Sequence, residues 1–198
     1  IEAKYSDSNW KIFSSQSVIK NNSFIVNTNY SNQYYSIIYA NESVISENTY
    51  SHTTTVYGDR VHFIYTAGSE NNRSVIENNL INLVSEGNLY DNYNAVINLG
   101  GYTDFISNTL NRFLTNPSND GDGLELLESW GADNIISGNT FFDSQNDRTV
   151  YFSNSTNAIF TNNIIHKEGY IAAIELSNSD VLISHNLIES EGRGIVMN

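Results

Sequence analysis

The sequence predicts an all-β solenoid, in which short strands wind around one core and stack coil upon coil. Two observations lead to this class. One short phrase recurs seven times along the 198 residues, and its apolar residues come in short β-branched runs instead of at helical spacings. A fixed period of this kind indicates stacked units, because no single unit can bury its apolar face alone.

The phrase consists of an apolar residue, two small or polar residues, an asparagine and, two positions after it, a second apolar residue. Its asparagines are separated by 23 to 31 residues, and they are Asn22, Asn48, Asn79, Asn108, Asn139, Asn163 and Asn186. The shortest of these spacings suits a coil of three short strands and three bends. The extra residues of longer coils are expected in the bends, where insertions cost least.

We expect the asparagines to occupy tight bends, because asparagine tolerates left-handed backbone geometry and its amide can bond the same amide on neighbouring coils. The fourth phrase is one residue short, so a place beside the ladder is also open for Asn108. The prediction is a parallel β-helix of about seven coils, with one domain over residues 1–198. Residues 1–16 form a partial N-terminal coil, and residues 17–198 hold the repeats.

The composition limits the partners. The chain has 22 acidic and 9 basic residues, a formal net charge of -13 and no cysteine. Such an acidic surface repels phosphate backbones, which argues against nucleic acid as a partner. No stretch approaches 18 continuous apolar residues, so no transmembrane segment is expected. Residues 194–198 end inside an apolar strand, and we therefore expect an uncapped part of a longer helix, or another chain at the C-terminal end.

One stacked sheet is expected to carry a strip of outward side chains. Its strands are predicted at 61–63, 97–99, 124–126, 150–152, 174–176 and 195–197, and alternation places each central residue outward. The expected column is His62, Asn98, Glu125, Tyr151, Glu175 and Val196, preceded in sequence by Arg60, Asp122, Arg148 and Arg193. A groove that contacts sugars would use His62, Asn98, Tyr151, Glu175 and Arg148. The alternative is that polar residues simply fill solvent-facing positions.

The segment 119–128 is the most suggestive chemically. It follows the long bend 111–119, and long bends are where function concentrates. Asp120, Asp122 and Glu125 offer the hard oxygen ligands that calcium prefers, which makes calcium the candidate cofactor. The segment lacks the full spacing of an EF-hand loop, and a solvated acidic turn is the alternative.

The repeated phrase resembles that of right-handed parallel β-helix proteins of the pectate lyase-like superfamily, over roughly residues 17–198. The resemblance implies a right-handed solenoid and an extracellular or cell-surface location. That superfamily includes polysaccharide lyases, glycoside hydrolases and non-catalytic adhesins, so the fold does not choose among these functions.

Two enzyme resemblances can be compared residue by residue. Residues 119–152 look like polygalacturonase-type hydrolases, and this resemblance implies Asp122 with Asp147 or Glu125 as the catalytic carboxylates. Asn146 replaces the expected partner of Asp147, and no histidine stands near 168–170 where the family keeps one.

Residues 123–157 are similar in rhythm to β-helix alginate and chondroitin lyases. Those enzymes use a calcium-neutralised uronate, a lysine base and an arginine on successive coils. Here residues 128–130 stand at the lysine position and residues 152–154 at the arginine position, so both cations are missing.

Two functions follow from these patterns. The first is a non-catalytic extracellular β-helix module, adhesin-like, that binds a polysaccharide or another surface. The second is an enzyme that degrades an extracellular polysaccharide, a lyase or glycoside hydrolase, with its site near Asp122, Glu125 and Asp147. The missing catalytic motifs favour the first.

Overall fold

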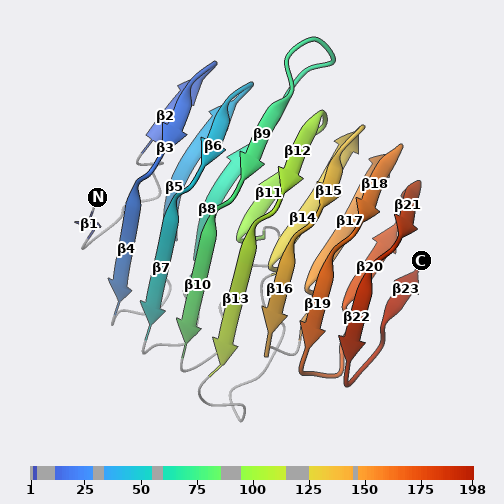
Figure 1. Cartoon of the computed structure of the whole chain (residues 1–198). Coiled ribbons are helices and arrows are strands. Elements are labelled where there is room, and N and C mark those ends of the chain that lie inside the picture. The colour runs from blue at the N-terminus through green and yellow to red at the C-terminus, as the bar shows by residue number, and fades with distance from the viewer. Residues whose placement is uncertain are drawn as a thin grey trace.

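A computed structural model describes residues 2–3, 12–28, 34–54, 60–85, 95–114, 125–144 and 147–198. Within these ranges the regular structure consists of strands, which pair in parallel into three sheets (Figure 1). Neighbouring strands within a sheet are three apart in the chain order, so each coil contributes one strand to each sheet. The predicted all-β parallel solenoid is confirmed. Its right-handed winding and its superfamily stay predictions.

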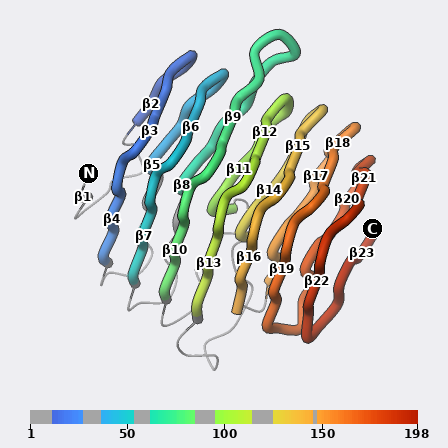
Figure 2. Tube along the Cα trace, viewed as in Figure 1, coloured from blue at the N-terminus to red at the C-terminus, as the bar shows by residue number. Residues whose placement is uncertain are grey.

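The three sheets run the length of the solenoid, and Figure 2 shows the coils following one another from the N-terminus to the C-terminus. The first sheet consists of β1 (Glu2–Ala3), β4 (Ser23–Thr28), β7 (Thr49–Thr54), β10 (Leu80–Ser85), β13 (Thr109–Leu114), β16 (Thr140–Asp143), β19 (Ile164–Lys167) and β22 (Leu187–Ser190). The second consists of β2 (Ile12–Ser15), β5 (Tyr34–Asn41), β8 (Arg60–Thr66), β11 (Ile97–Leu99), β14 (Leu127–Ala132), β17 (Val150–Thr156), β20 (Ile174–Ser177) and β23 (Ile195–Met197). The third consists of β3 (Val18–Lys20), β6 (Val44–Ser46), β9 (Ser74–Glu77), β12 (Thr103–Ile106), β15 (Ile135–Ser137), β18 (Ala158–Thr161) and β21 (Val181–Ser184).

The repeated phrase forms the bend between the third and the first sheet. Its two apolar positions face the interior from either side of the bend, and on most coils both are buried, as Phe105 and Leu110 are. The asparagine between them forms a ladder. Asn79 donates from its backbone N and from Nδ2 to Oδ1 of Asn108, and Asn108 donates in the same way to Asn139. Asn108 therefore belongs to the ladder, and a place beside it is excluded.

The left-handed geometry belongs to a different residue from the one predicted. The residue immediately before each ladder asparagine has a positive φ, for example 57° at Asn21, 56° at Ser107 and 55° at His185. The asparagine itself contributes its amide, which stays within hydrogen-bond reach of both neighbouring coils. The expectation that the ladder asparagines take the left-handed conformation is therefore wrong by one position.

The last described coils expose apolar side chains. The inward residues Ile183 on β21 and Ile188 on β22 are only partly buried, whereas their equivalents on the preceding coil, Phe160 and Ile165, are fully buried. The partner chain or further coils predicted for this face stay a prediction. No helix in the described residues is long and apolar enough to span a membrane.

Candidate functional site

The outward side chains of the second sheet form one column that runs along the solenoid. The strand registers align Phe13, Tyr39, Tyr65, Asn98, Glu128, Tyr151, Glu175 and Val196, and we call this set the outward column. The sequence placed Asn98, Tyr151, Glu175 and Val196 correctly. It was wrong at two coils, where Tyr65 and Glu128 stand in place of His62 and Glu125.

The error has a structural cause at the start of the second sheet. There, two consecutive residues are both buried, as Phe63 and Ile64 are in β8 and as Leu126 and Leu127 are at β14. The chain turns a corner at this point, so alternation does not continue from the residues before it. The sequence pattern assigns the outward residue from positions before the corner. It therefore gives His62 and Glu125, each three positions before the observed outward residue.

His62 does not contribute to the solvent-facing surface. It is buried, and its Nδ1 lies 3.0 Å from the backbone oxygen of Ala95 on the next coil. Its environment is that of a hydrogen-bonded corner residue. The predicted role of His62 in a sugar-contacting groove does not agree with this position.

The N-terminal half of the outward column is aromatic. Phe13, Tyr39 and Tyr65 stack with ring centroids 4.9 and 4.8 Å apart and with interplanar angles of 13° and 7°. The stack ends at Asn98, whose short side chain follows Tyr65 in the column. Trp130 adds a further aromatic contact beyond this point. Its ring is tilted by 49° relative to that of Tyr65, and the two ring centroids are 6.3 Å apart.

An open groove lies where the aromatic stack ends. Its volume is about 480 Å³, and it is lined by Tyr65, Asn98, Glu128, Trp130, Gly131, Ser153 and Asn154. Asn98 is only 3% exposed, and no hydrogen bond holds its side-chain amide within the described part of the chain. The amide is not among the fully buried polar groups that lack a partner, so water in the groove reaches it. A ligand hydroxyl that takes the place of this water can keep its hydrogen bonds. The groove thus combines aromatic walls with a donor and an acceptor that remain available.

The far wall of the groove is shaped by a β-bulge. The register between β14 and β17 shifts after Trp130, which leaves Asn154 as the additional residue with a φ of 52°. Asn178 donates from Nδ2 to Oδ1 of Asn154 at 2.7 Å, which orients this amide at the groove. Bulges commonly redirect a side chain next to a functional site.

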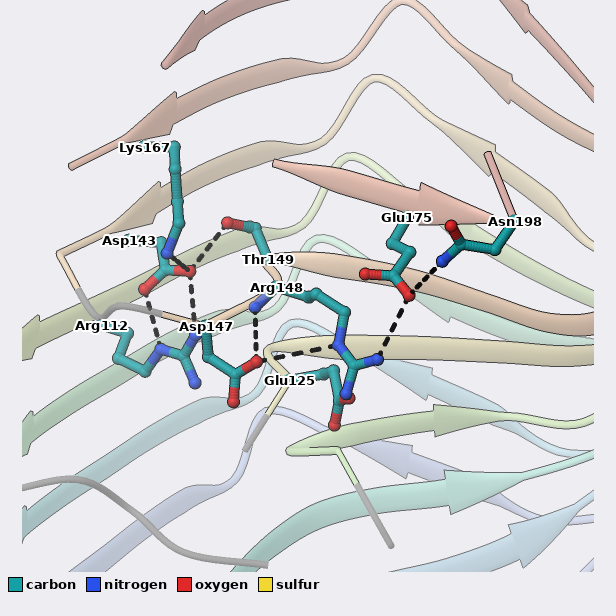
Figure 3. Close-up of polar contacts among 9 residues, drawn as sticks. All are labelled: Arg112, Glu125, Asp143, Asp147, Arg148, Thr149, Lys167, Glu175 and Asn198. Carbon is teal, nitrogen blue, oxygen red and sulfur yellow. Dashed lines mark hydrogen bonds and ion pairs between the residues drawn. The ribbon is translucent and has the colours of Figure 1, made fainter. Parts of the chain in front are cut away.

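Next to the groove, three carboxylates predicted from the sequence, those of Glu125, Asp147 and Glu175, surround the side chain of Arg148 (Figure 3). Its guanidinium contacts Glu125 and lies 3.5 Å from Glu175 Oε1 and 3.7 Å from Asp147 Oδ1. It also lies 4.4 Å from the centroid of the Tyr151 ring. We call these five residues the Arg148 cluster. Asp147 Oδ1 also accepts a hydrogen bond from the backbone N of Arg148 at 2.7 Å, whereas Oδ2 is buried without a partner.

Two carboxylates beside Arg148, those of Glu125 and Asp147, have raised pKa values. Burial is the main cause at both Glu125 and Asp147, and Arg148 opposes it at each. Burial and the charge of Glu125 raise the pKa of the Glu128 carboxyl to about 7, because together they outweigh the attraction of Arg148. No hydrogen bond or ion pair holds the Glu128 carboxylate among the described residues. Near neutral pH this group exchanges a proton at the groove.

Behind the Arg148 cluster lies a fully buried column of charges, also drawn in Figure 3. Arg112, Asp143 and Lys167 face inward at the same position of β13, β16 and β19. Asp143 accepts from Arg112 at 2.9 and 2.8 Å, from Lys167 at 3.1 Å and from Thr149 at 2.7 Å. Thr149 follows Arg148 in the chain, so the buried column holds in place the segment that carries the Arg148 cluster.

The predicted calcium site stays a prediction, because two of its three ligands, Asp120 and Asp122, lie outside the described residues. The same holds for Asp122 as a catalytic residue and for Asn146. Glu125, the third predicted ligand, contacts Arg148. No group of three or more His, Asp or Glu side chains in the described ranges is placed to hold a metal ion.

Of the residues that line the groove, the sequence predicted only Asn98, and those it missed include Tyr65, Glu128 and Trp130. Tyr65 and Glu128 each follow directly after a pair of consecutive buried residues. Alternation that starts at the second residue of the pair places the next residue outward, so it would have identified both. At the positions where the lyase resemblance expects cations, the structure has Glu128 and Ser153 in the groove instead. Comparison with protein-family models, curated proteins and solved structures gives no match to this chain.

Proposed function

We propose that this protein is a non-catalytic β-helix module that binds a polysaccharide in the groove, outside the cell or at its surface. The observation that carries the proposal is the amide of Asn98, which lines the groove together with the aromatic side chains of Tyr65 and Trp130. Saccharides present paired donors and acceptors next to apolar ring faces. An amide flanked by Tyr65 and Trp130 is complementary to that pattern.

The direction of the groove supports a chain-like ligand. The outward column runs across successive coils, about 4.8 Å apart, so a linear glycan lying along it would contact several strands at once. Ser153, Asn154 and Asn178 extend the polar contacts beyond the aromatic end. The rigid sheet fixes these side chains before binding, which reduces the ordering cost.

Trp130→Ala is expected to weaken glycan binding by about tenfold or more, because aromatic anchors in a groove contribute most of the binding energy. Glycan-array screening of the wild type identifies the ligand, and isothermal titration compares the variants. Phe113→Ala is the matched control. Phe113 is 40% exposed and Trp130 is 37% exposed, but Phe113 lies on the first sheet, away from the groove. Equal losses in both variants, or no glycan bound by the wild type, would contradict the proposal.

A second candidate is a polysaccharide-degrading enzyme. The observation in its favour is Glu128, because a carboxylic acid with a pKa of about 7 suits general acid catalysis at neutral pH. Glu125 and Asp147, predicted as catalytic carboxylates, lie in the adjacent Arg148 cluster. If the protein cleaves a glycan, Glu128→Gln should lower the rate by about a hundredfold or more, measured as new reducing ends or unsaturated uronates. A wild type that binds glycans without releasing such products would exclude this candidate.

A further inference from the structure

The charge around the groove indicates which saccharides it selects. Among the described residues that line it, Glu128 is the only ionisable group besides Tyr65, and there is no lysine or arginine. The cation beside it, Arg148, is engaged by Glu125, Asp147, Glu175 and the Tyr151 ring. The chain as a whole carries a formal charge of -13. A uronate or sulfated sugar would therefore meet repulsion at this surface.

The same side chains suit a positive charge. Two aromatic rings at 49° to each other, with centroids 6.3 Å apart, form adjoining walls, and a cation within about 6 Å of a ring centroid is attracted to its face. Glu128 lines the same groove, and its charge raises the pKa of Tyr65, after the larger contributions of burial and Tyr39. The Glu128 carboxylate is thus close enough to the Tyr65 hydroxyl to act on it electrostatically, and no cation of the described residues forms an ion pair with it.

We propose that the groove binds the ammonium group of an amino sugar between Tyr65 and Trp130, with Glu128 as its counter-ion. This inference rests on saccharide binding by the same groove, and it names the class of saccharide. Asn98 would bond a hydroxyl of the same sugar ring. An N-acetylated sugar lacks the charge, so it would lose the ion pair and the attraction to the rings while it keeps the remaining contacts.

The test compares two probes that differ only at nitrogen, a glucosamine hexamer and an N-acetylglucosamine hexamer, by isothermal titration at pH 7. The wild type is expected to bind the glucosamine hexamer at least tenfold more tightly. Glu128→Gln should remove this preference and change the affinity for the N-acetylated hexamer by less than about threefold. Thermal unfolding of the variant checks that it is folded.

Glu175→Gln is the matched control for net charge. It removes one carboxylate from the same outward column, outside the groove, so it should keep the preference for the amine. Equal loss of the preference in both variants would show a general attraction of a polycation to an acidic protein, and it would overturn the proposal. So would a preference that survives in Glu128→Gln.

A fixed-charge probe, tetramethylammonium, separates the titration of Glu128 from that of the sugar amine. Because Glu128 has a pKa of about 7, its ionised fraction increases about tenfold between pH 6 and pH 8, and the affinity for the probe should rise by a similar factor. An affinity that does not depend on pH would contradict the role of Glu128. If the wild type binds both hexamers equally and Trp130→Ala abolishes both, the ammonium proposal fails and the saccharide groove stands. If neither hexamer nor any arrayed glycan binds, the proposed function fails as well.

Discussion

Replacement of Asp143 by asparagine is expected to lower the free energy of unfolding by about 3–5 kcal/mol, as for other buried ion pairs that lose one partner. Arg112 and Lys167 would remain in the interior without the negative charge that pairs with both, and the amide would keep only one oxygen to accept from Arg112, Lys167 and Thr149. The side chains of Arg112, Asp143 and Lys167 are all fully buried, so water cannot replace the lost charge. Urea unfolding followed by circular dichroism measures the change.

Asp104→Asn provides the matched control. Asp104 pairs with Arg73 on the neighbouring coil, but the two side chains are 20% and 29% exposed, so the loss should be about 1 kcal/mol or less. A triple variant, Arg112→Met, Asp143→Leu and Lys167→Met, tests the cause. It removes every charge of the buried column and should be more stable than Asp143→Asn, because no buried cation is left without the Asp143 carboxylate. A triple variant that is less stable than Asp143→Asn would show that packing, not unpaired charge, dominates.

The buried column also predicts the response to acid. The pKa of Asp143 is lowered in the folded state, because Arg112 and Lys167 outweigh the opposing effect of burial. Its contribution to stability is therefore complete above the unfolded-state pKa of about 3.9 and is lost as the pH falls below that value. The difference in stability between the wild type and Asp143→Asn should shrink below about pH 4, and a constant difference would contradict the assignment.

The scaffold was predictable because one residue type recurs at one structural position. Every ladder asparagine bonds its counterparts on the next coils, so its spacing in the sequence is the length of a coil. Insertions in the bends change the spacing without changing the position of the asparagine. The bend residue before it was harder to predict, since Glu47, Ser107 and His185 all adopt the left-handed conformation there. The backbone, stabilised by the ladder, imposes that conformation on residues that seldom take it.

The site was predictable only in part, because the second sheet has no marker comparable to the asparagine. Its register depends on where the corner of each coil lies, and burial of consecutive residues such as Leu126 and Leu127 marks that corner only once the fold is known. Glu125 was expected in the outward column for this reason. It still lies beside Arg148, because that side chain reaches from a neighbouring coil to the residues just before the sheet.

The buried charges were missed for a different reason. Arg112, Asp143 and Lys167 each stand two residues after the second apolar position of the phrase, where alternation again points inward. On other coils this position holds Val26 or Leu83, so the pattern was present in the sequence. Charged residues are ordinarily expected at the surface, whereas opposite charges on adjacent coils can satisfy one another in the interior.

Asn108→Ala is expected to lower the free energy of unfolding by about 3 kcal/mol, since each buried polar group left without a partner costs about 1–3 kcal/mol. The backbone N and Nδ2 of Asn79 would lose their acceptor, and the carbonyl oxygens of Ile76 and Ile106 would each lose a donor. Oδ1 of Asn139 would lose one of its two donors, the Nδ2 of Asn108, and would keep the backbone N of residue 108. Alanine cannot admit enough water to satisfy these groups, because Asn108 is buried in the centre of the ladder.

Asn111→Ala is the matched control, because it tests whether loss of any asparagine pair between coils costs as much stability as loss of a ladder asparagine. Asn111 also donates to an asparagine of the preceding coil, Asn82, but it makes this one bond at 2.8 Å in a partly exposed position, so its loss should cost less than about 1 kcal/mol. Hydrogen exchange gives the second readout. In a solenoid each coil is stabilised by its neighbours, so Asn108→Ala should reduce the protection of the Asn79 amide before that of amides on distant coils. Equal costs in the two variants, or a uniform loss of protection, would mean that the ladder does not couple neighbouring coils.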